Sequence, residues 1–498
     1  MMDIFKIDGR QYMEDNNMKR GLTSRHITMI AIGGAIGTGL FVATGSVISE
    51  AGPGGAILAY LLIGIMLYFL MASIGELATF YPVSGSFSSY STRFVDPSLG
   101  FTMGWLYWGM WTLVTSVDVI VAANVLKFWD AFNFFSPLTW SLIFITLLLL
   151  LNIFSVKAFG ETEFWLSLIK VVTIIVFIVV GILMIFGILG GHTYGFENYT
   201  KGEAPFVGRL SGFLAVLLVA GFSVGGTEVV AVTAGESDNP EKTMPRAVKQ
   251  VFWRILLFYV LSIAVIAAII PYTDPLLLNE SQSVTQSPFT IVFDRIGIAF
   301  AASVINAVIL TSLLSAANSG IYTTSRMLYS LGVDKQAPQF FNKLNKTTKL
   351  PIRSILTTYL LVVAVVIYAN FNSNAVFNLL NIIGSMVIIV WGSSIWAQIR
   401  VRRAIKKQGK DANELLPYKA PFYPFGPIVV IATLLFLLFD LEILLVYPYV
   451  VSAYTNGIYG LVIMLVFFLV LTLGFAFELG KNALKIESRQ TTSFNYKS

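Results

Sequence analysis

The chain has 498 residues, of which 56% are hydrophobic and 12% charged, and its mean hydropathy is +0.77. Soluble domains carry roughly 25% charged residues, so the composition excludes an ordinary soluble protein and predicts an integral membrane protein. The net charge of +6 is assigned to cytoplasmic loops rather than to nucleic-acid binding. Cysteine is absent and the two histidines stand apart, so we expect neither disulfides nor a metal site.

Twelve membrane-spanning segments are predicted from apolar runs of about 20 residues. They are 28–49, 55–80, 101–128, 137–155, 163–189, 209–235, 252–271, 296–331, 354–370, 375–398, 424–447 and 457–479. With the N-terminus inside, most of the 33 Lys and Arg residues fall in cytoplasmic segments or at their helix ends. Both termini are therefore predicted to be cytoplasmic.

The segments between the spans are short and carry no signal of a soluble domain. The polar stretch before the first span lacks the features of a cleaved signal peptide, so the first span is expected to remain. A basic run, "RVRRAIKKQGK" at 400–410, follows the tenth span. We interpret it as an orientation anchor, with contact to anionic lipid as the alternative. The protein is expected to act within or across the bilayer.

Two spans contain glycine-rich interruptions, "IGGAIGTGLF" at 32–41 and "VAGFSVGGTEVV" at 219–230. Broken helix is tolerated in a membrane only where it is buried in protein or lines a wet cavity. The two spans are five apart and run in opposite directions, a pattern typical of inverted-repeat secondary transporters. Close helix packing through small residues is the alternative for each run alone.

Backbone groups freed by such breaks suit a zwitterion. The N–H groups at a half-helix N-terminus attract a carboxylate, and free carbonyls at a half-helix C-terminus accept hydrogen bonds from an ammonium group. The pattern therefore predicts an α-amino acid as the ligand.

Ionisable residues at membrane depth indicate function by default. Glu228 directly follows the second break, where it can meet a cationic group or hold the unwound segment by a hydrogen bond. Asp118 lies in the third span and either binds a cation or pairs internally. Lys170, in the fifth span, either exchanges a proton from a buried position or extends to the interface.

Two further acids are interpreted as gating or packing residues. Glu236 lies further toward the cytoplasm than Glu228, and Glu76 lies near the cytoplasmic end of the second span. No nucleotide-binding loop and no hydrolase motif is present. The run "GGAIGTG" is similar to a dinucleotide-binding fingerprint, but no strand precedes it and it lies within a membrane span. We therefore expect no cofactor, no ATP drive and no enzymatic activity.

Several motifs resemble those of the amino acid transporter branch of the amino acid, polyamine and organocation superfamily. They are "LTSRHITMIAIGGAIGTGLFVATG", "GELATFYPVSGSF", "GGTEVVAVTAGESDNPEKTMPRAVKQVFWRI" and "NSGIYTTSRMLYSL". The resemblance runs from about residue 20 to 480 with order and spacing kept. Within the branch, "QVFWRILLFYV", "IIPYTDP" and "FGETEFWLSLIKV" look most like the bacterial lysine-specific permeases.

The resemblance implies an all-α fold of twelve transmembrane helices, with helices 1 and 6 broken. A first inverted repeat of five spans would occupy 28–200 and a second 201–398. A basic loop and two peripheral helices would follow at 399–480, between cytoplasmic tails at 1–27 and 481–498. The protein would reside in a bacterial plasma membrane.

The resemblance also assigns roles to individual residues. The substrate carboxylate would meet the first break at Gly37, Thr38 and Gly39, and the α-amino group would meet carbonyls of the second. In proton-coupled relatives a lysine at the position of Lys170 replaces a sodium ion, which implies proton coupling. The predicted substrate-binding residues are Gly37, Thr38, Gly39, Phe222, Ser223, Gly225, Thr227, Glu228 and Asp118.

The resulting hypothesis is a proton-coupled importer of a basic amino acid by alternating access, with L-lysine favoured. Histidine and arginine remain alternatives, because the third span reads "YWGMWTLVTSVD" where bacterial lysine permeases have a more polar stretch containing Asn-Trp-Ala. Spans three, six, eight and ten are expected to select the side chain. A permease-like sensor (transceptor) is the rival of another class, and a channel is disfavoured. The expected partners are the amino acid, protons and the lipid bilayer, and the oligomeric state is not predicted.

Overall fold

The computed structural model describes residues 22–34, 36–154, 156–237, 239–277, 287–295, 300–372 and 375–437. Within these ranges every regular element is a helix, and the one β-type contact is an isolated bridge between Leu22 and Ser237. The all-α class predicted from the sequence is confirmed for this part of the chain.

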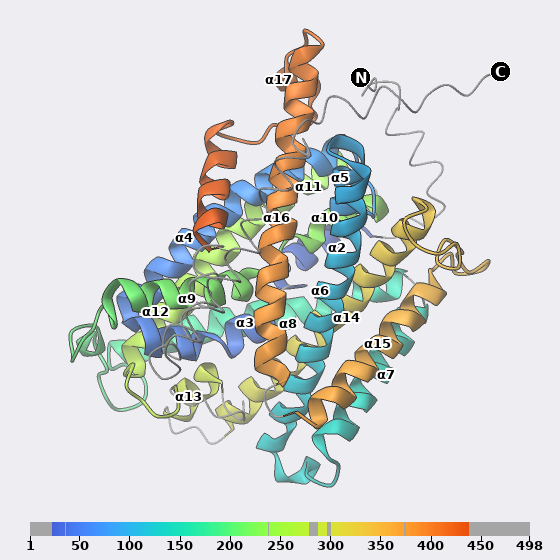
Figure 1. Ribbon diagram of the computed structural model, residues 1–498. Coiled ribbons are helices and arrows are strands. Elements are labelled where there is room, and N and C mark those ends of the chain that lie inside the picture. Colours follow the sequence, from blue (N-terminus) through green and yellow to red (C-terminus); the bar gives the residue numbers. More distant parts are fainter. Residues whose placement is uncertain are drawn as a thin grey trace, which may run out of the picture. The chain divides into compact units, whose positions relative to one another are not determined.

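Nine helical segments in the described ranges are long and apolar enough to cross a membrane. Figure 1 shows them as a bundle, which makes the protein polytopic. Seven are α4 (Thr44–Phe80), α6 (Pro97–Val125), α7 (Pro137–Phe154), α8 (Val156–Ile185), α14 (Ala301–Val333), α15 (Ile352–Asn370) and α16 (Ala375–Lys407). The other two are composite, namely α9 (Arg209–Val224) with α10 (Val229–Thr233), and α11 (Pro240–Arg254) with η6 (Ile255–Val260) and α12 (Leu261–Ile269). They correspond to the predicted spans two to ten.

The first predicted span is divided into short pieces, and none of the pieces before α4 is long enough to count among the nine. It contains the end of α2 (Ser24–Met29), the π-helix η1 (Ile30–Gly34), the one-turn α3 (Thr38–Phe41) and the beginning of α4. The connection expected after residue 49 is present as a sharp kink, at which two helices within α4 meet. Gly52 has φ +72° there, and Pro53 follows it, because a residue before proline is disfavoured in the α region.

Two boundaries near the C-terminal end also differ from expectation. The tenth span was predicted to end at 398, whereas α16 continues to Lys407 and takes most of the basic run into its last turns. Of the eleventh predicted span, the structure describes the apolar helix Phe425–Leu437. The twelfth predicted span, 457–479, and the C-terminal tail lie outside the described residues.

The bundle is held together by helices that lie far apart in sequence. α6 packs along α14, and α4 packs against α9 and α11. α7 and α15 lie side by side (Figure 1). Smaller helices complete the described fold, namely α5 (Ser86–Phe94), α13 (Pro288–Asp294), α17 (Ala412–Leu415), η2 (Leu126–Phe128), η3 (Asp130–Phe132), η4 (Glu197–Tyr199) and η5 (Ala234–Glu236).

α8 presents its apolar face outward and its polar face inward, the reverse of a soluble helix. The outward side chains are exposed and large, namely Trp165, Ile169, Val172, Val176 and Val179. The inward side chains are fully buried, namely Glu163, Ser167, Lys170, Ile174 and Phe177. A bilayer solvates the first set and excludes the second, so the helix is oriented by lipid.

Candidate functional site at the two helix breaks

The first break lies between the end of η1 at Gly34 and the start of α3 at Thr38. Gly37 stands there as the N-cap of α3, with non-helical dihedral angles (φ −150°, ψ −136°). The break predicted from the glycine run is therefore present, and it faces the interior, because Thr38 is buried.

The glycines around this break also allow two helices, α9 and α8, to approach the backbone. A Cβ placed on Gly39 would lie 2.3 Å from Cα of Ser223, and one on Gly33 would lie 2.5 Å from Cβ of Ser167. Real Cβ atoms do not come that close. Unwinding and close packing, treated as alternatives for the sequence, occur together, and the two breaks touch each other at Gly39.

The second break separates α9, which ends at Val224, from α10, which begins at Val229. Gly226 adopts φ +88°, a left-handed conformation that glycine reaches without steric cost. Its N–H donates to Oε2 of Glu228 at 2.9 Å. One carboxylate oxygen of Glu228 thus holds the unwound segment, as the structural alternative for this residue required.

A small cavity lies where the two breaks meet, with a volume of about 40 Å³. Its lining includes Gly37, Thr38, Gly39, Met110, Trp111, Val114, Asp118, Phe222, Ser223, Gly225, Gly226, Glu228, Ala316, Ile383 and Val387. Pockets that bind organic ligands usually measure about 300–1,000 Å³. An organic ligand is larger than the cavity, so side chains or helices must move before one binds.

Eight of the nine predicted substrate-binding residues line this cavity. The ninth, Thr227, is buried beside them but is not part of the lining. Sequence reasoning missed Met110, Trp111 and Val114. These residues follow the helical spacing that leads back along α6 from Asp118, so their periodicity was the available signal.

The carboxylates of Asp118 and Glu228 face the cavity, and one oxygen of each accepts a hydrogen bond. Thr38 Oγ1 donates to Oδ1 of Asp118 at 2.6 Å. Among the described residues, Oδ2 of Asp118 and Oε1 of Glu228 accept no hydrogen bond of ordinary geometry, although the indole of Trp391 lies close to the carboxyl group of Glu228. A buried acceptor without a partner costs about 1–3 kcal/mol, and a charged one more. These oxygens are placed to accept hydrogen bonds from a cationic group.

Lys170 is fully buried and joins α8 to the first break. Its Nζ donates to the carbonyl oxygens of Gly33 and Ile36, at 3.0 Å each. The alternative that this side chain extends to the membrane interface is therefore wrong. Lys170 also interacts electrostatically with Asp118, the acid that bonds to Thr38.

The two predicted gating acids form buried ion pairs outside the cavity. Oε1 of Glu236, the last residue of η5, accepts from Nε of Arg326 at 2.9 Å. Oε1 of Glu76 accepts from Nε of Arg402 at 2.7 Å, and its other oxygen accepts from the backbone of Ala420. Gating by these acids stays a prediction.

The place of Arg402 corrects the interpretation of the basic run. Its side chain is 5% exposed and lies over the ring of Tyr423, 4.1 Å from the ring centroid. This member of the run therefore joins α16 to α4 inside the protein and does not serve as a surface anchor. The sequence did not reveal this, because Glu76 and Arg402 are brought together only by the packing of the two helices.

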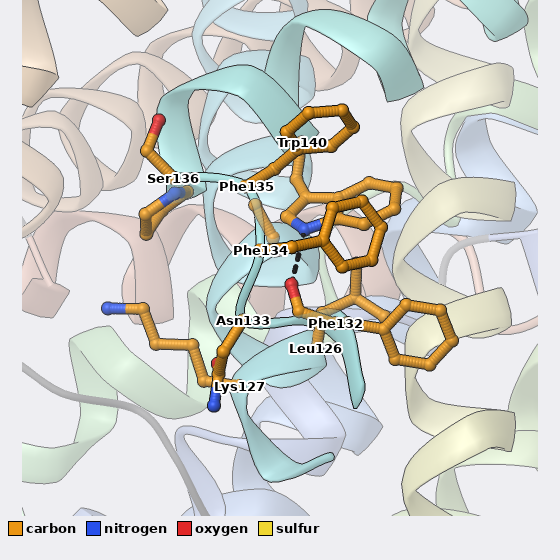
Figure 2. A pocket seen from close by; sticks show the side chains of 10 residues that line it. Leu126, Lys127, Phe132, Asn133, Phe134, Phe135, Ser136 and Trp140 are labelled. Atoms are coloured by element: carbon orange, nitrogen blue, oxygen red, sulfur yellow. Dashed lines mark hydrogen bonds between the residues drawn. The ribbon is translucent and has the colours of Figure 1, made fainter. Parts of the chain in front are cut away.

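A larger pocket, of about 350 Å³, lies at the segment between α6 and α7. Figure 2 shows its aromatic wall, in which Trp140 donates from Nε1 to the carbonyl oxygen of Phe132 at 3.0 Å. Its lining comes entirely from residues 123–140 and includes neither break. Exposed rings such as Phe134 and Phe135 are typical of a membrane-interface belt. We therefore place the functional site at the smaller cavity.

The fold and the site together define the class of protein. The described chain is a helical membrane protein whose charged cavity lies between two interrupted helices, the arrangement of secondary transporters. Its sequence matches the model of the amino acid permease family over residues 26–486, and the chain belongs to that family. The predicted family is confirmed, and so is the expectation of a transporter rather than an enzyme.

Curated relatives cover most of the chain. It is 50% identical over 415 residues to the histidine permease HisP of Lactococcus lactis subsp. cremoris (strain MG1363), covering 83% of this chain and 86% of that protein. It is 49% identical over 418 residues to the lysine-specific permease LysP of Escherichia coli (strain K12), covering 83% and 85%. The lysine-specific permease LysP of the same Lactococcus strain is 48% identical over 423 residues, covering 83% and 82%.

Proposed function

We propose that this amino acid permease imports a basic amino acid together with protons, and that L-lysine is its substrate. The observation that carries the proposal is the pair of buried carboxylate oxygens, Oδ2 of Asp118 and Oε1 of Glu228, that accept no hydrogen bond of ordinary geometry among the described residues. A cationic side chain supplies the donors and the charge that these oxygens need. The lysine and histidine permeases among the relatives support a basic substrate.

In this proposal the amino acid lies across the two breaks. Its α-carboxylate meets the backbone and the hydroxyl group of Thr38 at the first break, and its α-ammonium group meets carbonyls of the second break around Phe222. The side-chain ammonium group then meets Glu228 or Asp118. Because Asp118 already occupies the hydroxyl of Thr38, the incoming carboxylate has to displace it.

Lys170 provides the link to protons. As an ammonium group it holds two carbonyls of the first break against α8. Loss of the proton removes the charge and weakens both bonds, which frees the first break to move relative to α8. Protonation thereby biases one arrangement of the site over the other, as coupled transport requires.

Alternating access would move the two repeats, 28–200 and 201–398, about this site in a bacterial plasma membrane, with both termini cytoplasmic. The ion pairs of Glu76 and Glu236 would then act as cytoplasmic gates. Histidine and arginine are the alternatives for the substrate, since the identities to HisP and LysP differ by one percentage point. A sensor role has no observation in its favour.

The function is tested in proteoliposomes with an inside-alkaline pH gradient and no sodium. We expect labelled lysine to accumulate, and competition by each of the twenty amino acids to rank the substrates. Uptake that ignores the pH gradient refutes proton coupling. Inhibition by neutral amino acids that equals inhibition by lysine refutes a basic substrate.

A further inference from the structure

A third buried carboxylate, Glu163, lies on the inward face of α8, and the proposed function does not use it. Its side chain is fully buried. Oε1 accepts from Oγ of Ser315 at 2.6 Å and from Oγ of Ser167 at 3.3 Å, and Oε2 accepts from Nδ2 of Asn318 at 3.5 Å. Three donors, two on the facing helix α14 and one on α8 itself, suit an ionised carboxylate, which only accepts hydrogen bonds.

The position of Glu163 relates it to Lys170. The two residues are seven apart on one helix face, about 10 Å along the axis at 1.5 Å per residue. Ser167 stands between them, packed against Gly33, whose carbonyl accepts from Lys170. The same α8 face therefore carries the acid, the hydroxyl and the amine, and the hydroxyl and the amine lie against the first break.

The other charged groups around this face are few. Lys170 interacts electrostatically with Glu163, with Asp118 on α6 and with Arg254 on α11. His26 on α2 pairs with Glu161, which is two residues from Glu163 along α8. Nε2 of His26 lies 3.1 Å from Oε1 of Glu161. Asp118 is engaged by Thr38 at the cavity. In the described chain, Glu163 is thus the carboxylate near Lys170 that lies outside the substrate cavity.

We propose that Glu163 is a positioning residue for proton exchange, the fixed countercharge that lets Lys170 hold its proton inside the membrane. The inference rests on the proposed proton coupling. A buried ammonium group without a counter-ion is strongly destabilised. When Asp118 is engaged by the substrate or by Thr38, Glu163 keeps Lys170 charged. The proton binds the lone pair of Nζ from one side of the membrane and leaves from the same atom toward the other.

The test compares the pH dependence of lysine accumulation in the wild type and in Glu163→Gln, which keeps shape but loses the charge. With the axial spacing of about 10 Å taken as the separation of the charges, and an effective dielectric constant near 20, the interaction shifts protonation by roughly one pH unit. We expect the external pH of half-maximal accumulation to move toward acid by about that amount. Lysine counterflow, which needs no net proton movement, should stay within about threefold of wild type.

Two further variants separate charge from packing. Glu163→Asp retains the charge and should restore the wild-type pH profile. Glu161→Gln, two residues away on the same helix, changes an acid that pairs with Arg25 and His26 near the protein surface, and should leave the profile unchanged.

The outcomes distinguish the inference from the function beneath it. If the wild type ignores the pH gradient, the proposed proton coupling fails, whatever Glu163 does. If the wild type is proton-driven and Glu163→Gln keeps its pH profile, only the inference fails. If Glu163→Gln loses both counterflow and accumulation, and Glu163→Asp is equally inactive, Glu163 has a structural role. This outcome also overturns the inference.

Discussion

The contact between the two breaks can be tested by adding a single methyl group. In Gly39→Ala the new Cβ would lie 2.3 Å from Cα and 2.8 Å from the carbonyl oxygen of Ser223. Ordinary contacts begin at 3.4 Å, so the breaks must separate by about 1 Å. Overpacking of this kind costs ~1–3 kcal/mol. If the loaded site needs the breaks in contact, the KM for lysine rises about 5- to 150-fold.

The measurement is the concentration dependence of lysine counterflow in proteoliposomes. Gly109→Ala on α6 is the matched control, because a Cβ at Gly109 meets no atom within 4 Å, and its KM should equal that of the wild type. A wild-type KM in Gly39→Ala, with folded protein confirmed by gel filtration, would refute the reasoning that contact between the breaks shapes the site.

Three other substitutions test the charged groups. Lys170→Ala should lose accumulation driven by a pH gradient but retain counterflow, and unchanged uphill uptake would argue against coupling through this residue. Glu228→Gln should weaken inhibition by lysine more than inhibition by a neutral amino acid, whereas equal losses would indicate a structural role. Arg326→Met leaves Glu236 buried without its partner and should cost ~3–5 kcal/mol, seen as a lower Tm in detergent. Adding Glu236→Leu should recover most of that loss, and an unshifted Tm in the single variant would contradict the buried pair.

The breaks could be predicted from the sequence because their cause is local. Glycine weakens a helix wherever it stands, and a membrane forbids unsatisfied backbone unless protein covers it. Two glycine runs in corresponding spans therefore indicated broken helices before any packing was known. The same argument placed Thr38 and Glu228 at one site, where the structure has them.

The ion pairs could not be predicted in this way. Arg326 and Glu236, like Arg402 and Glu76, are far apart in the chain and meet only through helix packing. The basic run at 400–410 is explained by membrane topology, and that explanation gives no sign that Arg402 is buried. Glu163 was missed for a related reason, since "FGETEFW" gives no sign of which acid turns inward until the neighbours of α8 are known.

If the substrate carboxylate binds at Thr38 as proposed, the bond between Thr38 and Asp118 makes the protein a competitor for its own binding site. A carboxylate supplied by the chain already holds the hydroxyl proposed for the carboxylate of the substrate. Each arrival is then an exchange of one acid for another rather than the filling of a void. Part of the binding free energy offsets the loss of the bond between Thr38 and Asp118. This lowers the affinity for the substrate and makes its release faster. A carrier must release its substrate in every cycle, so an internal competitor of this kind favours fast turnover over tight binding.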